Sequence, residues 1–514
     1  MKLTARTPLY DKIRRIALYL LLAAIPGTGH MEGAPETEQT GGPSASPTAA
    51  GPTFYVDATG GSDANDGLTV ATAWQTLDRV NSSAVPPGST VLFKRGEIWR
   101  GQIRPRSGTA RHPTRYGAWG TGAKPAILGS VNRKNPGDWV NGVGHWTNRD
   151  GKNLWRCVTP FDTDTGNLIF NGATSCGFKK WSQKDLSAQG DYYYDRGTRQ
   201  LMMYSTANPG SVYREIEIAL RRDIVDQNNA SFVTYEDLAI KYGAAHGFGG
   251  TNNAFITIRN CEISFIGGGD LFMDGSDIRY GNGVEFWANA HDCLVEQCRL
   301  WEIYDTPLTN QNTFENVSQY NITYRNNVMW NYAYGALECW STTASSTMAH
   351  IRFENNTCIG AGEGWGKPPQ RPDPSGYQLV LRGTPGKIAD VCIRNNILYQ
   401  STGSLLWIQY TSQWAAALTL DHNCWYQAEG NVVYLEDLGK AYTMSQFPAY
   451  QSFTGKDAHS QAADPLFVNA GAHDYHLQAG SPCVDAGADT GIADDGDGRP
   501  RPAGRGPDIG AYER

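Results

Sequence analysis

A short phrase of alternating apolar residues that ends in a pair of small or polar residues recurs between residues 255 and 424. Its copies read FITIRNCEI, CLVEQCRLW, ITYRNNVMW, IRFENNTCI, VCIRNNILY and LTLDHNCWY. They follow one another at intervals of 37, 29, 29, 40 and about 27 residues, and the second members of their pairs are Cys261, Cys298, Asn327, Asn356, Asn396 and His422 or Asn423. A unit that repeats at this length buries its apolar face by stacking on its neighbours.

The residue types within each copy favour strands over helices. The copies are rich in β-branched and aromatic residues and lack an apolar period of helical length. Asparagine tolerates left-handed backbone and bonds neighbouring amides, so the Asn pair marks a tight bend. The sequence therefore predicts an all-β fold, a coil of parallel strands whose core spans residues 231–463.

Composition excludes several classes of protein. The 514 residues include 58 glycines, 11% aromatic residues and only 18% charged residues, which is typical of a turn-rich β fold and not of a disordered chain. The net charge is −7 and no long basic run follows residue 15, which argues against a nucleic-acid partner. We expect a monomer.

The first 52 residues indicate export. Basic residues precede an apolar run at 16–25 that is too short to span a bilayer, so residues 1–30 predict a secretory signal. Residues 31–52 are rich in Pro, Gly, Ser and Thr and predict a disordered linker. We therefore expect a secreted, periplasmic or cell-surface protein without a stable membrane span.

Ten cysteines in an exported chain permit disulfides. Cys261 and Cys298 occupy the same repeat position on adjacent coils, so they are expected to stack as buried apolar side chains. A disulfide between them is the alternative, because a coil spacing of about 4.8 Å lies within bridging range. The run His422-Asn423-Cys424 lacks a second ligand pair in the sequence around it, so it predicts no zinc centre.

The opening segment, residues 53–130, contains YVDATGGSDANDG, AWQTLDRV, PPGSTVLFKRGEIWRG and GTGAKPAI, with a short helix expected from Trp74 to Val80. This order resembles the N-terminal part of secreted bacterial right-handed parallel β-helix proteins of the pectin-lyase-like type, including the family 9 pectate lyases. The resemblance extends to the repeats at 231–426 and to the tail at 464–513. It implies a right-handed parallel β-helix whose opening helix caps an otherwise naked sheet edge, and a closing segment at 464–514.

Residues 131–230 interrupt the repeat and predict an inserted small β subdomain. The run YYYDRGTRQLMMY has the form of a hairpin that turns at Asp195-Arg196-Gly197. We interpret the aromatic residues of this segment as its own core, with a sugar-binding platform as the alternative; they are Trp181, Tyr192, Tyr193 and Tyr194.

Candidate catalytic residues emerge when the coils are aligned on their bends. Glu285 and Glu338, each followed by a pair that ends in tryptophan, are expected two coils apart, at roughly 9–10 Å between backbones. Asp305 lies on the coil between them. Desolvation by the aromatic residues would raise a carboxyl pKa toward the range of a proton donor. Two or three carboxyl groups on one face suit glycoside hydrolysis.

Long bends between the coils predict the rim of the site. Arg371 lies in the bend after Asn356, and His246 and His291 are interpreted as satisfied hydrogen-bonding groups. The predicted substrate-binding residues are Trp287, Trp340, Glu363, Trp365, Lys367 and Arg382. The candidate calcium ligands, in the bend after Ile263, are Asp270, Asp274 and Asp277.

Three functions fit these residues. The first is a glycoside hydrolase that cleaves a polysaccharide through paired carboxyl groups. The second is a uronate lyase, for which the resemblance implies an aspartate-rich calcium site and a catalytic lysine; the nearest analogues are the three aspartates above and Lys367, which do not reproduce that family's pattern. The third is a noncatalytic glycan-binding surface protein. No cofactor is certain, and calcium is the one that the residues suggest.

Overall fold

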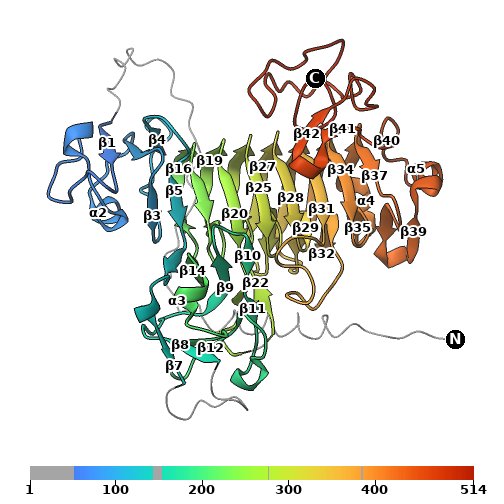
Figure 1. Ribbon diagram of the computed structural model, residues 1–514. Helices are drawn as coiled ribbons and strands as arrows, with labels where there is room; N and C mark the ends of the chain where they lie inside the picture. Colours follow the sequence, from blue (N-terminus) through green and yellow to red (C-terminus); the bar gives the residue numbers. More distant parts are fainter. Residues whose placement is uncertain (1–50, 143–152, 276, 384–385) are drawn as a thin grey trace, which may run out of the picture. The chain divides into compact units, whose positions relative to one another are not determined.

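The structure is a computed structural model that describes residues 51–142, 153–275, 277–383 and 386–514 (Figure 1). These residues belong to one compact unit. The expected export segment at 1–30 lies outside the described residues, as does the expected linker apart from Gly51 and Pro52. In the described part of the chain, none of the helices has the length and apolar character that a membrane crossing requires.

Three long sheets of mostly parallel strands form a right-handed parallel β-helix, as the repeat predicts. The first sheet contains β1 (Thr53–Val56), β2 (Thr90–Lys94), β4 (Thr114–Trp119), β16 (Ser231–Glu236), β19 (Ala254–Arg259), β24 (His291–Glu296), β27 (Ser318–Arg325), β30 (Thr347–Glu354), β33 (Lys387–Arg394) and β36 (Leu418–Asp421). The second contains β3 (Ile98–Arg100), β5 (Ala126–Leu128), β17 (Ala239–Lys241), β20 (Glu262–Ile266), β25 (Arg299–Ile303), β28 (Val328–Tyr332), β31 (Thr357–Ala361), β34 (Ile397–Ser401), β37 (Cys424–Tyr426) and β40 (Gln461–Ala462). The third contains β15 (Val225–Asp226), β18 (Phe248–Gly249), β23 (Val284–Phe286), β26 (Leu308–Asn312), β29 (Gly335–Ser341), β32 (Tyr377–Gly383), β35 (Leu406–Ile408), β38 (Val433–Leu435) and the antiparallel β39 (Lys440–Tyr442).

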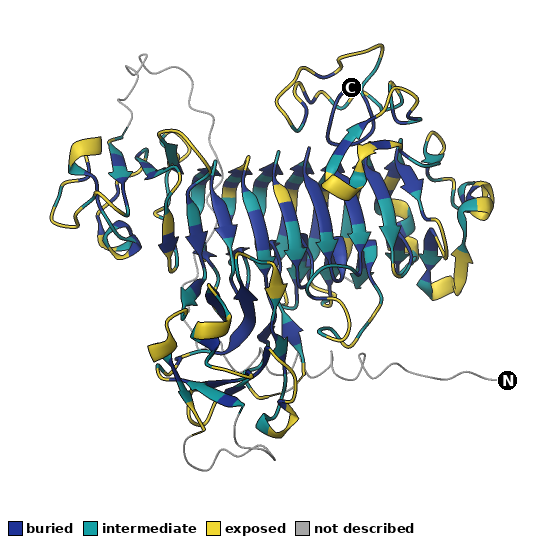
Figure 2. Ribbon diagram, in the orientation of Figure 1, coloured by how far each residue is buried: buried dark blue, intermediate teal, exposed yellow. Residues whose placement is uncertain are grey.

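The core of the β-helix is a set of apolar columns that run along its axis. Figure 2 shows that many residues of the stacked strands are buried. On the third sheet, Leu308, Leu337, Leu379 and Leu406 pair in register and are at most 1% exposed. Each such leucine contributes about 1.5–3 kcal/mol by burial. Because side chains alternate along a strand, the residues next to these leucines point to the outer face of the sheet.

The Asn pairs form the bend between the first and second sheets, and their two members have different roles. The first members, such as Asn326 and Asn355, adopt left-handed backbone with φ of 55° and 54°. The second members form a buried ladder in which the side-chain amide of one coil donates to the side-chain oxygen of the next, from Asn327 through Asn356 and Asn396 to Asn423. The ladder satisfies polar groups that the bend would otherwise leave buried without partners.

Asn356→Ala is expected to destabilise the β-helix by about 1–3 kcal/mol, because buried groups on both adjacent coils lose their partners. The Asn356 oxygen accepts from the backbone and side-chain nitrogens of Asn327, each at 3.0 Å, and its amide donates to the Tyr324 carbonyl at 3.0 Å. A lower midpoint of thermal or urea unfolding would confirm the role. An unchanged midpoint would mean that the ladder adds nothing to stability.

The ten cysteines are free. Cys261 and Cys298 stack at the start of the Asn column, where the Cys261 amide donates to the Cys298 sulfur at 3.4 Å. Both are fully buried, so they replace two asparagines as small apolar side chains, and the alternative of a disulfide is not realised.

The insert forms two small sheets beside the β-helix (Figure 1). Its elements are β6 (Ser130–Asn132), β7 (Trp139–Asn141), β8 (Leu154–Cys157), β9 (Thr165–Phe170), β10 (Ser175–Cys176), β11 (Phe178–Lys179), β12 (Asp191–Asp195), β13 (Gln200–Tyr204), α3 (Pro209–Val212) and β14 (Ile216–Leu220). The predicted hairpin is confirmed, since β12 and β13 pair antiparallel, but its turn lies at 196–199 because Asp195 still pairs with Gln200. Tyr192 and Tyr194 are buried in the insert's own core.

Both ends of the β-helix are covered. The opening helix α2 runs over Leu77–Ser82 and begins later than Trp74, because the Thr76 side chain accepts a bond from the Arg79 amide and caps its N-terminus. The other end carries α4 (Ser412–Ala417) and α5 (Phe447–Thr454), whose buried aromatic side chains join the core of the β-helix. The strands β41 (Phe467–Asn469) and β42 (Asp474–Leu477) of the closing segment pack instead on the side of the second sheet. The closing segment contacts the outside of the Asn bends, where the amides of Asn326 and Asn395 donate to carbonyls at 494 and 488.

Candidate active site

The outer face of the third sheet brings together the predicted catalytic residues. Glu285 pairs with Thr309, and Thr309 pairs with Glu338, so the two glutamates occupy one column two strands apart. The inward neighbours of Glu338, Leu337 and Cys339, belong to the core, so Glu338 points outward. The register confirms the alignment read from the sequence, and the strand spacing places the two backbones roughly 9–10 Å apart.

Glu338 is a buried acid on an outward-facing position. It is 6% exposed, and its carboxyl accepts a hydrogen bond from the side-chain amide of Gln311 on the preceding coil. Burial and the nearby charge of Asp305 raise the pKa of Glu338 to about 8, against the opposing effect of Arg382 and Arg371. Most of this carboxyl is therefore protonated at neutral pH, which is the state a proton donor needs.

Glu285 is held by a histidine and an asparagine. Its Oε2 lies 2.8 Å from His246 Nδ1 and accepts a bond from the Asn282 side-chain amide at 2.7 Å. Burial by itself would lower the pKa of His246, but the charge and hydrogen bond of Glu285, with the charge of Asp223, raise it to about 9. The backbone amide of Asn282 also donates to His246 Nδ1, at 3.1 Å, so Asn282 contacts both members of this pair.

Asp223 lies on the coil before His246 and is hydrogen-bonded to it. The His246 amide donates to Asp223 Oδ1 at 3.1 Å. Burial raises the pKa of Asp223, while the adjacent charge of His246 lowers it. Asp223, His246 and Asn282 each lie two or three residues before a strand of the third sheet, so the stacking of coils brings these distant residues to one corner.

Asp305 lies on the coil between the two glutamates and forms an ion pair with Arg371, at 2.8 Å from Nη1 to Oδ1. The Asp305 side chain is 18% exposed, which is more than either glutamate. The Arg371 guanidinium stacks 4.7 Å from the ring of Tyr334. Arg371 comes from the long bend after β31 and reaches a carboxylate that comes from another coil.

Two bends and the insert meet at Arg279, which is 7% exposed. Its guanidinium donates to the carbonyls of Gly268 at 2.7 Å and Gly166 at 2.6 Å, and it lies over the rings of Tyr304 and Trp365. Trp365 is fixed by its indole N–H, which donates to the Glu302 carbonyl at 2.9 Å. This packing holds the bend that carries Arg371 against the bend at 267–282.

The predicted substrate-binding residues divide into two groups. Trp340 and Trp287 are half-buried, and Trp340 is in register with Gln311 and Arg382 beside Glu338. Arg382 lies 4.1 Å from the ring of Trp407. Glu363 and Lys367, by contrast, pair with each other at 2.9 Å and are more than two-fifths exposed. Contact with a glycan stays a prediction for all of these residues and for Trp365.

The candidate calcium ligands lie in the bend of β21 (Gly269–Asp270) and β22 (Arg279–Tyr280). Asp270 is buried, and its oxygens accept from the amides of Phe272, Met273 and Gly275 at 2.9–3.1 Å. This carboxylate closes the bend, so it would have to give up amide partners to hold a cation. Asp274 and Asp277 are exposed in the same bend, and calcium binding stays a prediction.

Sequence reasoning missed four residues of this site. His246 is the hydrogen-bonding group that was expected, but its partner is a candidate catalytic glutamate. Gln311 lies in an aligned strand two positions after Thr309, where outward alternation would have pointed to it. Asn282 and Asp223 precede strands, and Asp223 lies in a range without the repeated phrase, so no periodic signal marks either one.

No protein-family model matches the chain, and no curated protein matches it. Among solved structures, it is similar to the complex of XylC with xylose, with 12% identity, a TM-score of 0.45, and coverage of 74% of this chain and 70% of that chain. It is similar to a glycoside hydrolase, with 10% identity, a TM-score of 0.45, and coverage of 75% and 95%. It is also similar to pectate lyase Pel9A, with 13% identity, a TM-score of 0.36, and coverage of 91% and 97%.

Proposed function

We propose that this protein is a glycoside hydrolase that cleaves a polysaccharide on the outer face of the third sheet, with Glu338 as the general acid. The observation that carries the proposal is a buried Glu338, whose pKa is raised to about 8, in the same column as Glu285 and near enough to Asp305 for the charge of that residue to act on it. Glycoside hydrolysis requires one carboxyl group that gives a proton and a second one that acts as base or nucleophile.

In the proposed reaction, protonated Glu338 gives its proton to the glycosidic oxygen as the bond to the anomeric carbon breaks. Asp305 takes a proton from a water molecule, and the oxygen of that water bonds to the anomeric carbon. Asp305 suits this role because it is the most exposed of the three carboxyl groups and pairs with Arg371. Glu285, held by His246, sits two strands from Glu338 in the same column and supplies the third carboxyl group of the site.

A uronate lyase is the second candidate, and the two arginines beside Glu338 favour it. The guanidinium charges of Arg371 and Arg382 both act on Glu338. Cations at this place suit the neutralisation of a uronic-acid carboxylate, which a lyase needs before it removes the adjacent proton. A noncatalytic glycan-binding protein is the third candidate.

A single assay separates the three. Neutral and acidic polysaccharides are incubated with the protein, with and without a chelator, while reducing ends and ultraviolet absorbance are followed together. The hydrolase proposal expects new reducing ends without ultraviolet absorbance, and no effect of the chelator. Unsaturated, ultraviolet-absorbing products would establish the lyase instead, and glycan retention without any product would establish the binder. The expected export signal and the monomeric state are proposals that a secretion assay and light scattering would test.

The pH dependence of kcat/KM is expected to report the ionisation of Glu338. The reacting form is the protonated acid, and the raised pKa keeps it populated up to about pH 8. We therefore expect kcat/KM to fall about tenfold per pH unit above that value, because the fraction of protonated Glu338 falls in that proportion. A rate that stays constant well above pH 8, measured where the fold is intact, would exclude Glu338 as the acid.

A further inference from the structure

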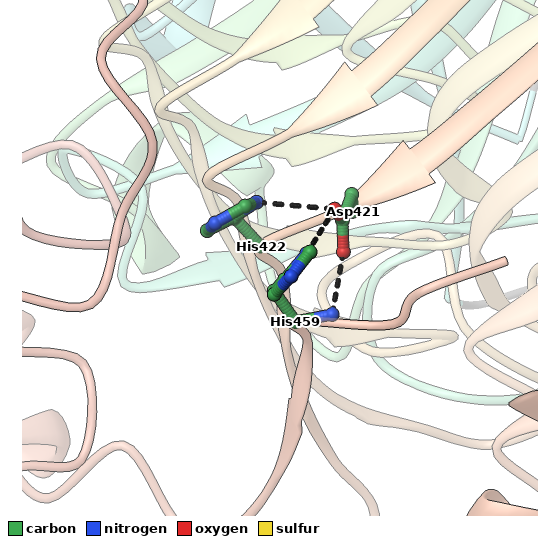
Figure 3. Close-up of side chains that lie close together, drawn as sticks. All are labelled: Asp421, His422 and His459. Atoms are coloured by element: carbon green, nitrogen blue, oxygen red, sulfur yellow. Dashed lines mark hydrogen bonds and ion pairs between the residues drawn. The ribbon is translucent and has the colours of Figure 1, made fainter.

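Two histidines and an aspartate meet at the last bend between the first and second sheets (Figure 3). Asp421 ends β36, His422 follows it, and His459 comes from the segment between α5 and β40. Figure 3 shows both imidazole rings beside the Asp421 carboxylate. The cluster lies on the first-sheet side of the final coil and shares no residue with the candidate active site.

The carboxylate is oriented for two nitrogen ligands. Asp421 Oδ1 accepts a bond from the His459 backbone amide at 2.7 Å, which fixes the side chain. The other oxygen, Oδ2, lies 2.7 Å from His459 Nδ1 and 3.3 Å from His422 Nδ1. The two rings stack with centroids 4.8 Å apart and an interplanar angle of 22°, and each has its Nδ1 beside the same oxygen, Asp421 Oδ2.

We propose that Asp421, His422 and His459 bind one divalent transition-metal ion of the zinc class. Imidazole nitrogen and carboxylate oxygen bind zinc at about 2.0–2.2 Å, so ligand atoms around a tetrahedral ion lie about 3.4 Å apart. One ligand atom from each residue lies within 4.8 Å of the others, and Asp421 Oδ2 lies 2.7 and 3.3 Å from the two Nδ1 atoms. Shifts of about 1 Å therefore complete the coordination sphere, with water in the remaining position.

The ligand types select the metal. Two imidazoles with one carboxylate suit zinc, nickel or copper, whereas calcium and magnesium prefer oxygen ligands. Binding would join the turn of the last coil to a segment 37 residues further along the chain. The proposed role is a structural staple at the end of the β-helix, and it does not depend on the proposed hydrolase activity.

The place of His422 in the repeat supports this reading. His422 is left-handed with φ of 52°, and it stands where the preceding coils have Asn326, Asn355 and Asn395. The side chains of those three asparagines reach out to the closing segment. On the last coil a histidine takes that position, and its outward neighbour is a second histidine.

The test is calorimetric titration of the full chain, without a histidine tag, with zinc chloride above the ordinary histidine pKa of about 6.5. We expect one zinc ion per chain, and binding weakened by more than about tenfold in His422→Asn and in His459→Ala, because each loses one of three ligands. His422→Asn installs the residue that the other coils carry at this left-handed position, so the bend is kept. Cobalt should give the visible absorption of a tetrahedral site in the wild type and not in His422→Asn or His459→Ala.

His350→Asn is the matched control. His350 is also left-handed, with φ of 53°, and its Nδ1 lies 2.7 Å from Asp390 Oδ2, in a pair with one histidine. This variant is expected to bind zinc as the wild type does. Absence of stoichiometric zinc binding to the wild type, or equal binding by His422→Asn, His459→Ala and the wild type, would overturn the proposal.

Discussion

Glu338→Gln is expected to lower the turnover of the glycan by about 10²–10⁴-fold, the usual contribution of a positioned general acid. The substituted amide keeps the shape of the side chain, and its oxygen can still accept the bond from Gln311. It has no acidic proton to give to the leaving oxygen. Reducing-end release by the wild type and the variant, at equal concentrations of folded protein, measures the effect.

Two comparisons separate a catalytic role of Glu338 from a structural one. An aryl glycoside of the same sugar, whose leaving group needs no proton, should be cleaved by Glu338→Gln far better than the polysaccharide, relative to the wild type. Glu354→Gln is the control for burial, since Glu354 is 5% exposed and pairs with Arg394 on the first sheet, away from the site. Turnover is expected to be kept in that control. Full turnover by Glu338→Gln would contradict the assignment of Glu338 as the general acid.

Arg501→Met is expected to destabilise the closing segment by about 3–5 kcal/mol, because it leaves a buried carboxylate without its partner. Arg501 Nη1 lies 2.8 Å from Glu513 Oε1, and both side chains are 1% exposed. The guanidinium also donates to the carbonyls of Asp508 at 2.8 Å and Gly510 at 3.0 Å. Faster proteolysis within 464–514 and a lower unfolding midpoint would measure the loss.

The double variant Arg501→Met/Glu513→Gln tests whether the unpaired charge of Glu513 causes the loss of stability in Arg501→Met. Glutamine carries no charge and keeps one of the two oxygens that accept from backbone amides, since Ala503 donates to Oε2 and Asp508 to Oε1, each at 2.9 Å. If the uncompensated charge is the main cost, the double variant should recover much of the stability that Arg501→Met loses. A double variant that is as unstable as the single one would show instead that lost hydrogen bonds, and not the uncompensated charge, dominate the cost.

The sequence predicted the β-helix and the column of the two glutamates because both depend on short-range periods. The repeated phrase marks each bend, and a strand of known register follows it. Side chains alternate with a period of two, so Glu285 and Glu338 had to share a face once their strands were aligned. The helix at the opening end and the hairpin of the insert also depend on local sequence. The first is a short helical segment next to a sheet edge, and the second is a short turn between two strands rich in aromatic residues.

The bends between coils follow no period, and only the tertiary structure decided what they bring together. It placed Arg371 on Asp305, and His246 with Asp223 and Asn282 around Glu285. It used Asp270 to close its own bend, although the sequence offered that residue as a calcium ligand. It also supplied His459 as the second histidine beside His422, where the local sequence indicated no metal centre. Contacts of this kind depend on the path by which the long loops fold back over the stacked coils. The repeat in the sequence carries no information about that path.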